Sequence, residues 1–162
     1  IYTEPGHGTT IKLYLPRSTA EADASARAPA EAKAPSGGGE TILVVEDDPG
    51  VLAYEVETLT SAGYKVIEAR TGGEALAHIA AGVMPDLLFT DVVLAGGMNG
   101  REVSDRVRAA RPGVKVLFAT GYTQNAIVHH GRLDEGVQLI SKPFSTNDLL
   151  SRIAKVLREE RR

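Results

Sequence analysis

The sequence has no cysteine among its 162 residues. Disulfide bonds, thiolate zinc sites and thiol catalysis are therefore excluded. No apolar run comes near the roughly 18 residues that a membrane-spanning helix needs, and no secretory signal peptide is expected. Charge of one sign is not in excess either, because 18 basic and 21 acidic side chains leave a net charge of −3. We therefore expect a cytoplasmic protein that contacts neither nucleic acid nor a membrane surface.

Composition divides the chain into three stretches, and its start at Ile1 rather than Met makes us expect a piece of a longer protein. Apolar side chains alternate along residues 10–15, after turn-forming glycines, so residues 1–16 predict strand and turn. Residues 17–40 are rich in alanine, interrupted by proline and closed by three consecutive glycines, which predicts a flexible linker. Residues 41–162 hold the regular apolar patterns of a folded domain.

Short apolar runs and helical patterns alternate in this third stretch. The predicted strands are residues 41–45, 65–69, 87–90, 114–119 and 137–140, and the predicted helices are residues 49–62, 72–81, 99–111, 124–130 and 145–162. Such alternation predicts an α/β fold, in which a five-stranded, doubly wound parallel sheet has helices on both faces. In sheets of this kind, ligands bind beyond the carboxyl ends of the strands.

Polar side chains follow four of the five predicted strands at those ends: Glu46 and Asp47 after the first, Asp91 after the third, Thr120 after the fourth and Lys142 after the fifth. Carboxylates that meet there repel each other by several kcal/mol at low dielectric unless a cation intervenes. Oxygen ligands without paired histidines favour Mg²⁺ over zinc, and Mg²⁺ leaves coordination positions for a phosphate. A carboxylate, a metal, an ammonium and a hydroxyl together predict phosphoryl transfer with a carboxylate nucleophile.

With these motifs in this order, residues 41–162 resemble the receiver domain of bacterial two-component response regulators. The matching segments are Val44-Val45-Glu46-Asp47-Asp48-Pro49, the strand end at Asp91, Phe118-Ala119-Thr120-Gly121-Tyr122 and Lys142-Pro143-Phe144. The resemblance implies a flavodoxin-like sheet with strand order 2-1-3-4-5. It also implies a cis peptide bond before Pro143.

The same resemblance implies a role for each site residue. Asp91 is then the phosphoacceptor, Thr120 bonds the phosphoryl group, and Lys142 pairs with the phosphate. The implied metal is Mg²⁺, held by Asp47 and Asp91 directly, by Glu46 through water and by the backbone carbonyl of Val93. The implied partners are a histidine kinase or phosphotransfer protein and a second copy of the chain. One departure is Leu139, where the family often has an aromatic residue that rotates on activation.

The amino-terminal stretch carries a second resemblance. Gly6-His7-Gly8-Thr9-Thr10, followed by the alternating residues 11–15, is similar to the last glycine motif and last strand of a histidine kinase ATP-binding domain. On this interpretation, residues 1–16 are a remnant of that domain, residues 17–40 a linker, and residues 41–162 the carboxyl-terminal receiver of a hybrid sensor kinase. The parent would be a histidine kinase, but the piece itself lacks the kinase core. A receiver catalyses only its own phosphorylation and dephosphorylation.

Two other functions fit part of the pattern. A small-molecule phosphatase or phosphotransferase of the haloacid-dehalogenase type would carry an Asp-x-Asp nucleophile pair, whereas Asp91 is followed by two valines. A degenerate receiver would serve only as a docking or dimerisation module, which the intact set of acids argues against. Individually, Asp48 is better explained as a charge that stabilises a helix start. His129 and His130 are better explained as surface residues, because adjacent helical side chains point apart.

Overall fold

The computed structural model describes residues 2–12, 14, 36–121 and 138–159. These residues belong to two units, which divide the chain into Ile1–Ala32 and Lys33–Arg162. In the first unit, β1 (Tyr2–Glu4) pairs antiparallel with β2 (Gly8–Thr10). Pairing in β2 ends at Thr10, the first residue of the strand predicted for residues 10–15, of which residues 13 and 15 lie outside the described residues. The turn sets this register, because the His7 amide donates to the Glu4 carbonyl over 3.0 Å and fixes which residues face each other.

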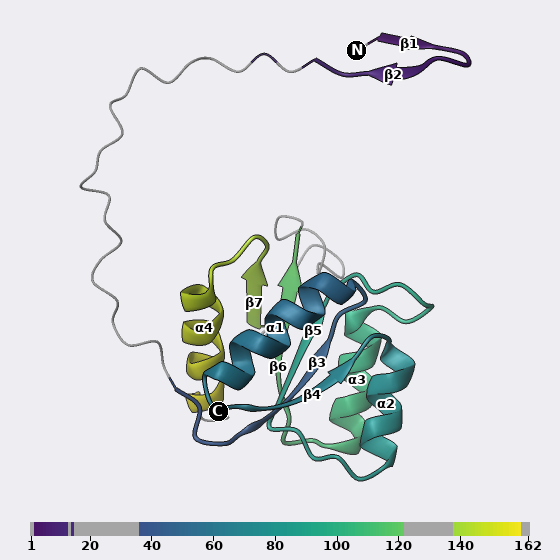
Figure 1. The fold of residues 1–162 in the computed structure, drawn as a ribbon. Helices are drawn as coiled ribbons and strands as arrows, with labels where there is room; N and C mark the ends of the chain where they lie inside the picture. Colours follow the sequence, from purple (N-terminus) through teal and green to yellow (C-terminus); the bar gives the residue numbers. More distant parts are fainter. Residues whose placement is uncertain (1, 13, 15–35, 122–137, 160–162) are drawn as a thin grey trace, which may run out of the picture. The chain divides into compact units, whose positions relative to one another are not determined.

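The second unit alternates strands and helices throughout. Its elements are β3 (Thr41–Val45), α1 (Pro49–Ser61), β4 (Lys65–Ala69), α2 (Gly72–Ala80), β5 (Leu87–Asp91), α3 (Gly100–Ala110), β6 (Lys115–Thr120), β7 (Gln138–Ser141) and α4 (Thr146–Arg158). The strands form one parallel sheet in the order β4-β3-β5-β6-β7, which is the predicted order 2-1-3-4-5 (Figure 1). The fold class predicted from the sequence is thereby confirmed. The helix predicted for residues 124–130 lies outside the described residues.

A polar side chain begins each of the four described helices where unpaired amides need acceptors, and for α2 it is Thr71, which accepts from the Glu74 amide. The Asp48, Asn99 and Ser145 side chains accept hydrogen bonds from the first-turn amides of α1, α3 and α4. At Asn99 and Ser145 the bond is reciprocal, because the acid three residues later accepts from the cap's own amide. These caps fix the first residue of each helix relative to the preceding strand end.

Helices cover both faces of the sheet and enclose two apolar cores (Figure 1). The first core lies under α1 and α4 and includes Ile42, Val44, Leu52, Leu59, Leu87, Phe89, Leu117, Ile140, Leu149 and Ile153. The second lies under α2 and α3 and includes Leu43, Val45, Ala75, Leu88, Val103, Val107, Val116 and Phe118. Successive strand residues enter opposite cores, as the two-residue period of a strand requires. Among the helices that the structure describes, none is both long and apolar enough to cross a membrane.

Candidate functional site

The strand period determines which charged side chains meet at the carboxyl end of the sheet. Glu46, Asp91 and Lys142 each come two residues after a member of the α1–α4 core, namely Val44, Phe89 and Ile140. Because side-chain direction repeats every two residues along a strand, all three charged groups leave the sheet on the α1–α4 face. Two acids and one base from three separate strands are thus brought to one place.

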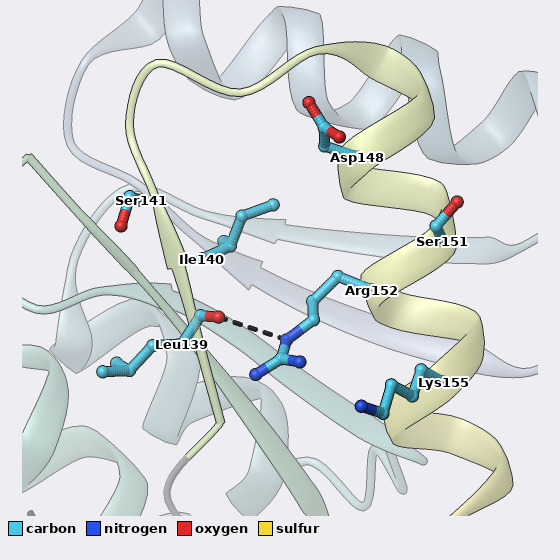
Figure 2. Close-up of a pocket in the computed structure, with 7 residues that line it drawn as sticks. All are labelled: Leu139, Ile140, Ser141, Asp148, Ser151, Arg152 and Lys155. Atoms are coloured by element: carbon cyan, nitrogen blue, oxygen red, sulfur yellow. Dashed lines mark hydrogen bonds between the residues drawn. The ribbon is translucent and has the colours of Figure 1, made fainter. Parts of the chain in front are cut away.

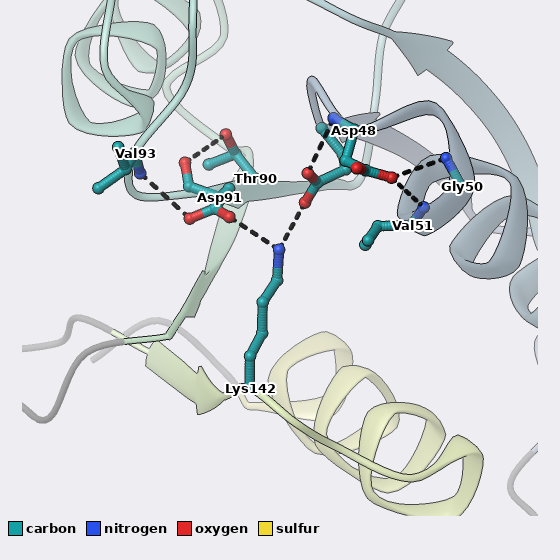
Figure 3. Close-up of polar contacts among 8 residues, drawn as sticks. Asp48, Gly50, Val51, Thr90, Asp91, Val93 and Lys142 are labelled. Atoms are coloured by element: carbon teal, nitrogen blue, oxygen red, sulfur yellow. Dashed lines mark hydrogen bonds and ion pairs between the residues drawn. The ribbon is translucent and has the colours of Figure 1, made fainter. Parts of the chain in front are cut away.

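Lys142 joins the two acids directly (Figure 3). Its Nζ lies 2.6 Å from Glu46 Oε2 and 2.7 Å from Asp91 Oδ2. The lysine side chain is 23% exposed and the Glu46 side chain only 4%. Partial burial acts to lower the pKa of Lys142, but its hydrogen bonds to Asp91 and Glu46 outweigh burial, and the pKa ends above its usual value. The ammonium therefore stays charged, bridges both carboxylates and offsets one of their two negative charges.

Backbone amides hold the remaining oxygens of the two acids. Glu46 Oε1 accepts from the Asp48 amide over 3.2 Å, and Asp91 Oδ1 accepts from the Val93 amide over 3.1 Å. Figure 3 shows the Asp91 carboxylate between the Val93 amide on one side and the lysine on the other. Both carboxylates are consequently fixed in orientation before any ligand binds, which is the geometry that positioned catalysis requires.

Asp48 does not join this cluster. Its Oδ1 accepts from the Val51 amide over 2.9 Å and from the Gly50 amide over 2.8 Å, which lowers the pKa of the Asp48 carboxyl. The side chain is exposed at the start of α1. The interpretation of Asp48 as a helix-start charge is therefore confirmed.

The other predicted site residues lie at the same end of the sheet as this cluster. Thr120 is buried at the end of β6, one residue beyond Ala119, which is the register partner of Asp91. Asp47 is partly buried and follows Glu46 at the end of β3. Val93 exposes 62% of its surface and contacts Asp91 through its amide. The peptide bond between Lys142 and Pro143 is cis, as the resemblance implied.

Hard oxygen ligands at the ends of the adjacent strands β3 and β5 match the donor chemistry of Mg²⁺. Within the described residues, however, no group of three or more His, Asp or Glu side chains is arranged to hold a metal ion. The Lys142 ammonium occupies the position between Glu46 and Asp91 that the sequence assigned to a cation. The acids therefore match Mg²⁺ in the type of donor atom, while the Lys142 ammonium lies between Glu46 and Asp91.

The glycine that opens α3 is packed against the backbone of Asp91. A Cβ at Gly100 would lie 1.9 Å from the Asp91 carbonyl oxygen, and the Gly100 amide donates to the Val92 carbonyl over 3.0 Å. No side chain fits at this position without displacing the end of β5. Glycine thus allows α3 to start directly behind the predicted phosphoacceptor.

A buried acid, Glu55, was not predicted from the sequence. Only 1% of its surface is exposed, and its Oε1 has no hydrogen-bond partner. Burial, together with the charges of Glu46 and Asp91 and against that of Lys142, raises the pKa of Glu55 to about 8. The signal was present, because Leu52, Glu55, Val56 and Leu59 follow the spacing of a helical apolar stripe.

A shallow groove lies between β7 and α4, and neither Glu46 nor Asp91 lines it (Figure 2). It is lined by Leu139, Ile140, Ser141, Asp148, Ser151, Arg152 and Lys155. The Arg152 Nε donates to the Leu139 carbonyl over 3.1 Å and so ties α4 to the strand. The Leu139 side chain is partly buried and packs against the second core. No aromatic ring stands at this position.

The sequence pattern of a family described as "Response regulator receiver domain" matches residues 42–154. The "Response regulator receiver protein CpdR" of Brucella abortus (strain 2308) is 32% identical over 116 residues, which cover 72% of this chain and 95% of that protein. The "Sensor kinase CckA" of the same organism is 33% identical over 165 residues. That match covers 98% of this chain, so it includes the stretch before the receiver pattern, but only 17% of the kinase.

A solved structure gives the same comparison in three dimensions. The receiver domain of the "Hybrid Histidine Kinase CckA" superposes with a TM-score of 0.62 at 29% identity, covering 73% of this chain and 99% of that one. A "response regulator receiver domain protein (CheY-like)" from Methanospirillum hungatei JF-1 has a TM-score of 0.64 at 32% identity, covering 74% and 94%.

Proposed function

Since the chain belongs to the response regulator receiver family and is a receiver domain of two-component signalling, we propose that Asp91 accepts a phosphoryl group from a phosphohistidine in a Mg²⁺-dependent reaction. The observation that carries this proposal is the fixed contact of Asp91 with Lys142, 2.7 Å apart at the end of β5. A nucleophile held in one orientation beside a permanent positive charge suits attack on an anionic donor.

In the proposed transfer, a carboxylate oxygen of Asp91 forms a bond to phosphorus while the phosphorus–nitrogen bond of the phosphohistidine breaks. The imidazole leaves, and an acyl phosphate remains on Asp91. Lys142 balances the negative charge of the transferred group, and the buried Thr120 hydroxyl donates to one of its oxygens. Mg²⁺, held by Glu46, Asp47, Asp91 and the Val93 carbonyl, would neutralise charge on the phosphoryl oxygens.

A small phosphodonor tests this proposal without a partner protein. Acetyl phosphate with Mg²⁺ is expected to add one phosphoryl group per chain, measured by intact mass, and none should appear when the metal is chelated. A panel of phosphate monoesters should not be turned over. Absence of any label under these conditions would leave a docking module as the function. Sustained turnover of a monoester would instead indicate a phosphatase.

The domain organisation extends the proposal to the rest of the chain. Residues 1–16 are interpreted as a remnant of a kinase ATP-binding domain, residues 17–40 as a linker, and residues 41–162 as the receiver. The match of 98% of the chain to a sensor kinase supports this arrangement. The proposed setting is a hybrid kinase in the cytoplasm, with a histidine kinase or phosphotransfer protein as donor or acceptor and a second copy of the chain as a further partner.

Removal of residues 1–40 should leave the rate of labelling by acetyl phosphate unchanged. The reason is that every side chain of the acidic cluster comes from the second unit, beyond residue 40. Labelling rates of the full chain and of residues 41–162 are compared at equal protein and Mg²⁺ concentrations. A several-fold change would show that the first stretch acts on the receiver and is not merely a remnant and a linker.

A further inference from the structure

We propose that Glu55 is an electrostatic gate on the Asp91 site: while neutral it permits phosphorylation, and once ionised it opposes it. This inference rests on the proposed function, because it concerns the same aspartate. It assigns a role to a side chain that makes no contact with the phosphoryl group. Glu55 would therefore be a positioning residue, which acts through the charge of the site.

The location of Glu55 supports this role. It lies six residues after Pro49, the first residue of α1, which corresponds to about 9 Å along a helix. Helical side chains lean towards the amino-terminal end of their helix, and for α1 that end adjoins the acidic cluster. The carboxyl is enclosed, with 1% exposure, and its Oε1 is without a partner. Burial opposes the ionisation of Glu55 most strongly, and the surrounding charges add to or offset that effect.

Charges from three strands act on this carboxyl. Glu46 after β3 and Asp91 at the end of β5 oppose its ionisation, while Lys142 after β7 favours it. All three leave the sheet on the face that α1 covers, as their places in the strand period require. With a pKa of about 8, Glu55 is neutral at pH 7 and ionises in the next two pH units.

The other elements on this face contribute charges that face solvent or are already bonded. β4 carries Glu68, which is exposed beside α1. α4 carries Asp148, exposed in its first turn, and Arg152, which donates to a backbone carbonyl. Exposed charges are screened by water and act weakly on a buried group. The charges of the acidic cluster therefore act more strongly on the ionisation of Glu55 than these exposed charges do.

Coupling between two sites is reciprocal in free energy. Phosphorylation adds negative charge at Asp91 and makes the ionisation of Glu55 more costly, because charges interact strongly where water is excluded. An ionised Glu55 must then disfavour the phosphorylated state by the same amount. The gate is open at neutral pH and closes as the pH rises past the pKa of Glu55.

The first test follows the titration of Glu55 itself and needs no phosphorylation. Carboxyl ¹³C signals of the full chain are recorded against pH, and the Glu55 signal is assigned by its loss in Glu55→Gln. Removing the charge of Asp91 with Asp91→Asn should lower the midpoint by about 0.5–1 pH unit. The control Glu57→Gln removes an exposed acid of the same helix and should not move it. An unchanged midpoint in Asp91→Asn would overturn the coupling.

The second test measures the consequence for phosphorylation. The phosphorylated fraction after acetyl phosphate and Mg²⁺ is measured from pH 6.5 to 9 for the wild type, Glu55→Gln and Glu57→Gln. The ratio of wild type to Glu55→Gln should fall by about 3–10-fold across this range, whereas the ratio to Glu57→Gln stays constant. A constant ratio for Glu55→Gln would overturn the gate. If no variant is labelled at any pH, the proposed function fails, and the titration still decides the coupling.

Discussion

Replacing Lys142 by methionine is expected to lower the free energy of unfolding by roughly 2–3 kcal/mol at pH 7 and to reduce labelling of the chain at least 100-fold. Methionine keeps most of the apolar stem but leaves the Glu46 and Asp91 carboxylates facing each other without a cation. Removing one partner of a buried ion pair costs about 3–5 kcal/mol, and the 23% exposure of the lysine side chain reduces that figure through solvent screening.

Urea unfolding of both proteins measures this loss directly. A matched control is Lys155→Met on α4, where an exposed lysine is removed and little change is expected. Mg²⁺ should restore more stability to Lys142→Met than it adds to the wild type, because a cation that binds the folded state stabilises it by mass action. If Lys142→Met unfolds at the same urea concentration as the wild type, the bridge between the two acids does not stabilise the fold.

The pH range of this contribution is set by the lysine. Since the folded-state pKa of Lys142 is raised above its ordinary value of 10.5, the stabilisation is complete below that pH. It is lost only as the pH rises through the folded-state pKa. Measurements near pH 7 therefore report the bridge at full strength.

Replacing Glu55 by glutamine should remove a large pH dependence of stability between pH 4.5 and pH 8. In the unfolded chain Glu55 titrates near 4.5, whereas in the folded protein its pKa is about 8. Between these values the folded state holds one more proton, so the free energy of unfolding falls by about 1.4 kcal/mol for each unit of rising pH. The stabilisation is full below pH 4.5 and is lost above pH 8, a total of about 4–5 kcal/mol.

Urea unfolding from pH 5 to pH 9 isolates this effect, because the difference between wild type and Glu55→Gln cancels the titration of every other group. Glutamine has nearly the same shape and stays neutral. The free energy of unfolding of Glu55→Gln should therefore increase relative to that of the wild type as the pH rises. Glu57→Gln should show no such trend, since Glu57 is exposed. A difference that is flat between pH 5 and pH 8 would mean that Glu55 ionises in the folded protein as it does in water.

The sheet could be predicted from the sequence because its inner strands β3, β5 and β6 are nearly continuous apolar runs. The predicted strand at residues 65–69 coincides with β4, and the one at residues 41–45 coincides with β3. Of the strand predicted at residues 10–15, Thr10 alone is paired among the described residues. Outside a core, alternation alone does not decide pairing, and there the turn before Gly8 set the register.

The candidate site was predicted in composition but not in its contacts. The strand ends identified Asp91 and Lys142 as site residues. The two-residue period of the three strands places Lys142, Asp91 and Glu46 on one face, and the interatomic distances show that Lys142 bridges the two acids. From the sequence, a metal was expected between the acids, and Lys142 was expected as a second positive charge that pairs with the phosphate. Glu55 was missed because a glutamate in a helix is ordinarily solvated, although its place among the apolar positions of α1 marked it as buried.

The most direct test of the proposed function is to locate the phosphoryl group. Protein labelled with acetyl phosphate is reduced with borohydride, which converts an aspartyl phosphate to an alcohol and marks its position for peptide mass spectrometry. We predict that the mark falls on Asp91 and that the nearly isosteric Asp91→Asn, which should fold, takes up no label. A mark on Asp47 or Asp48, or full labelling of Asp91→Asn, would contradict the assignment of Asp91 as the phosphoacceptor.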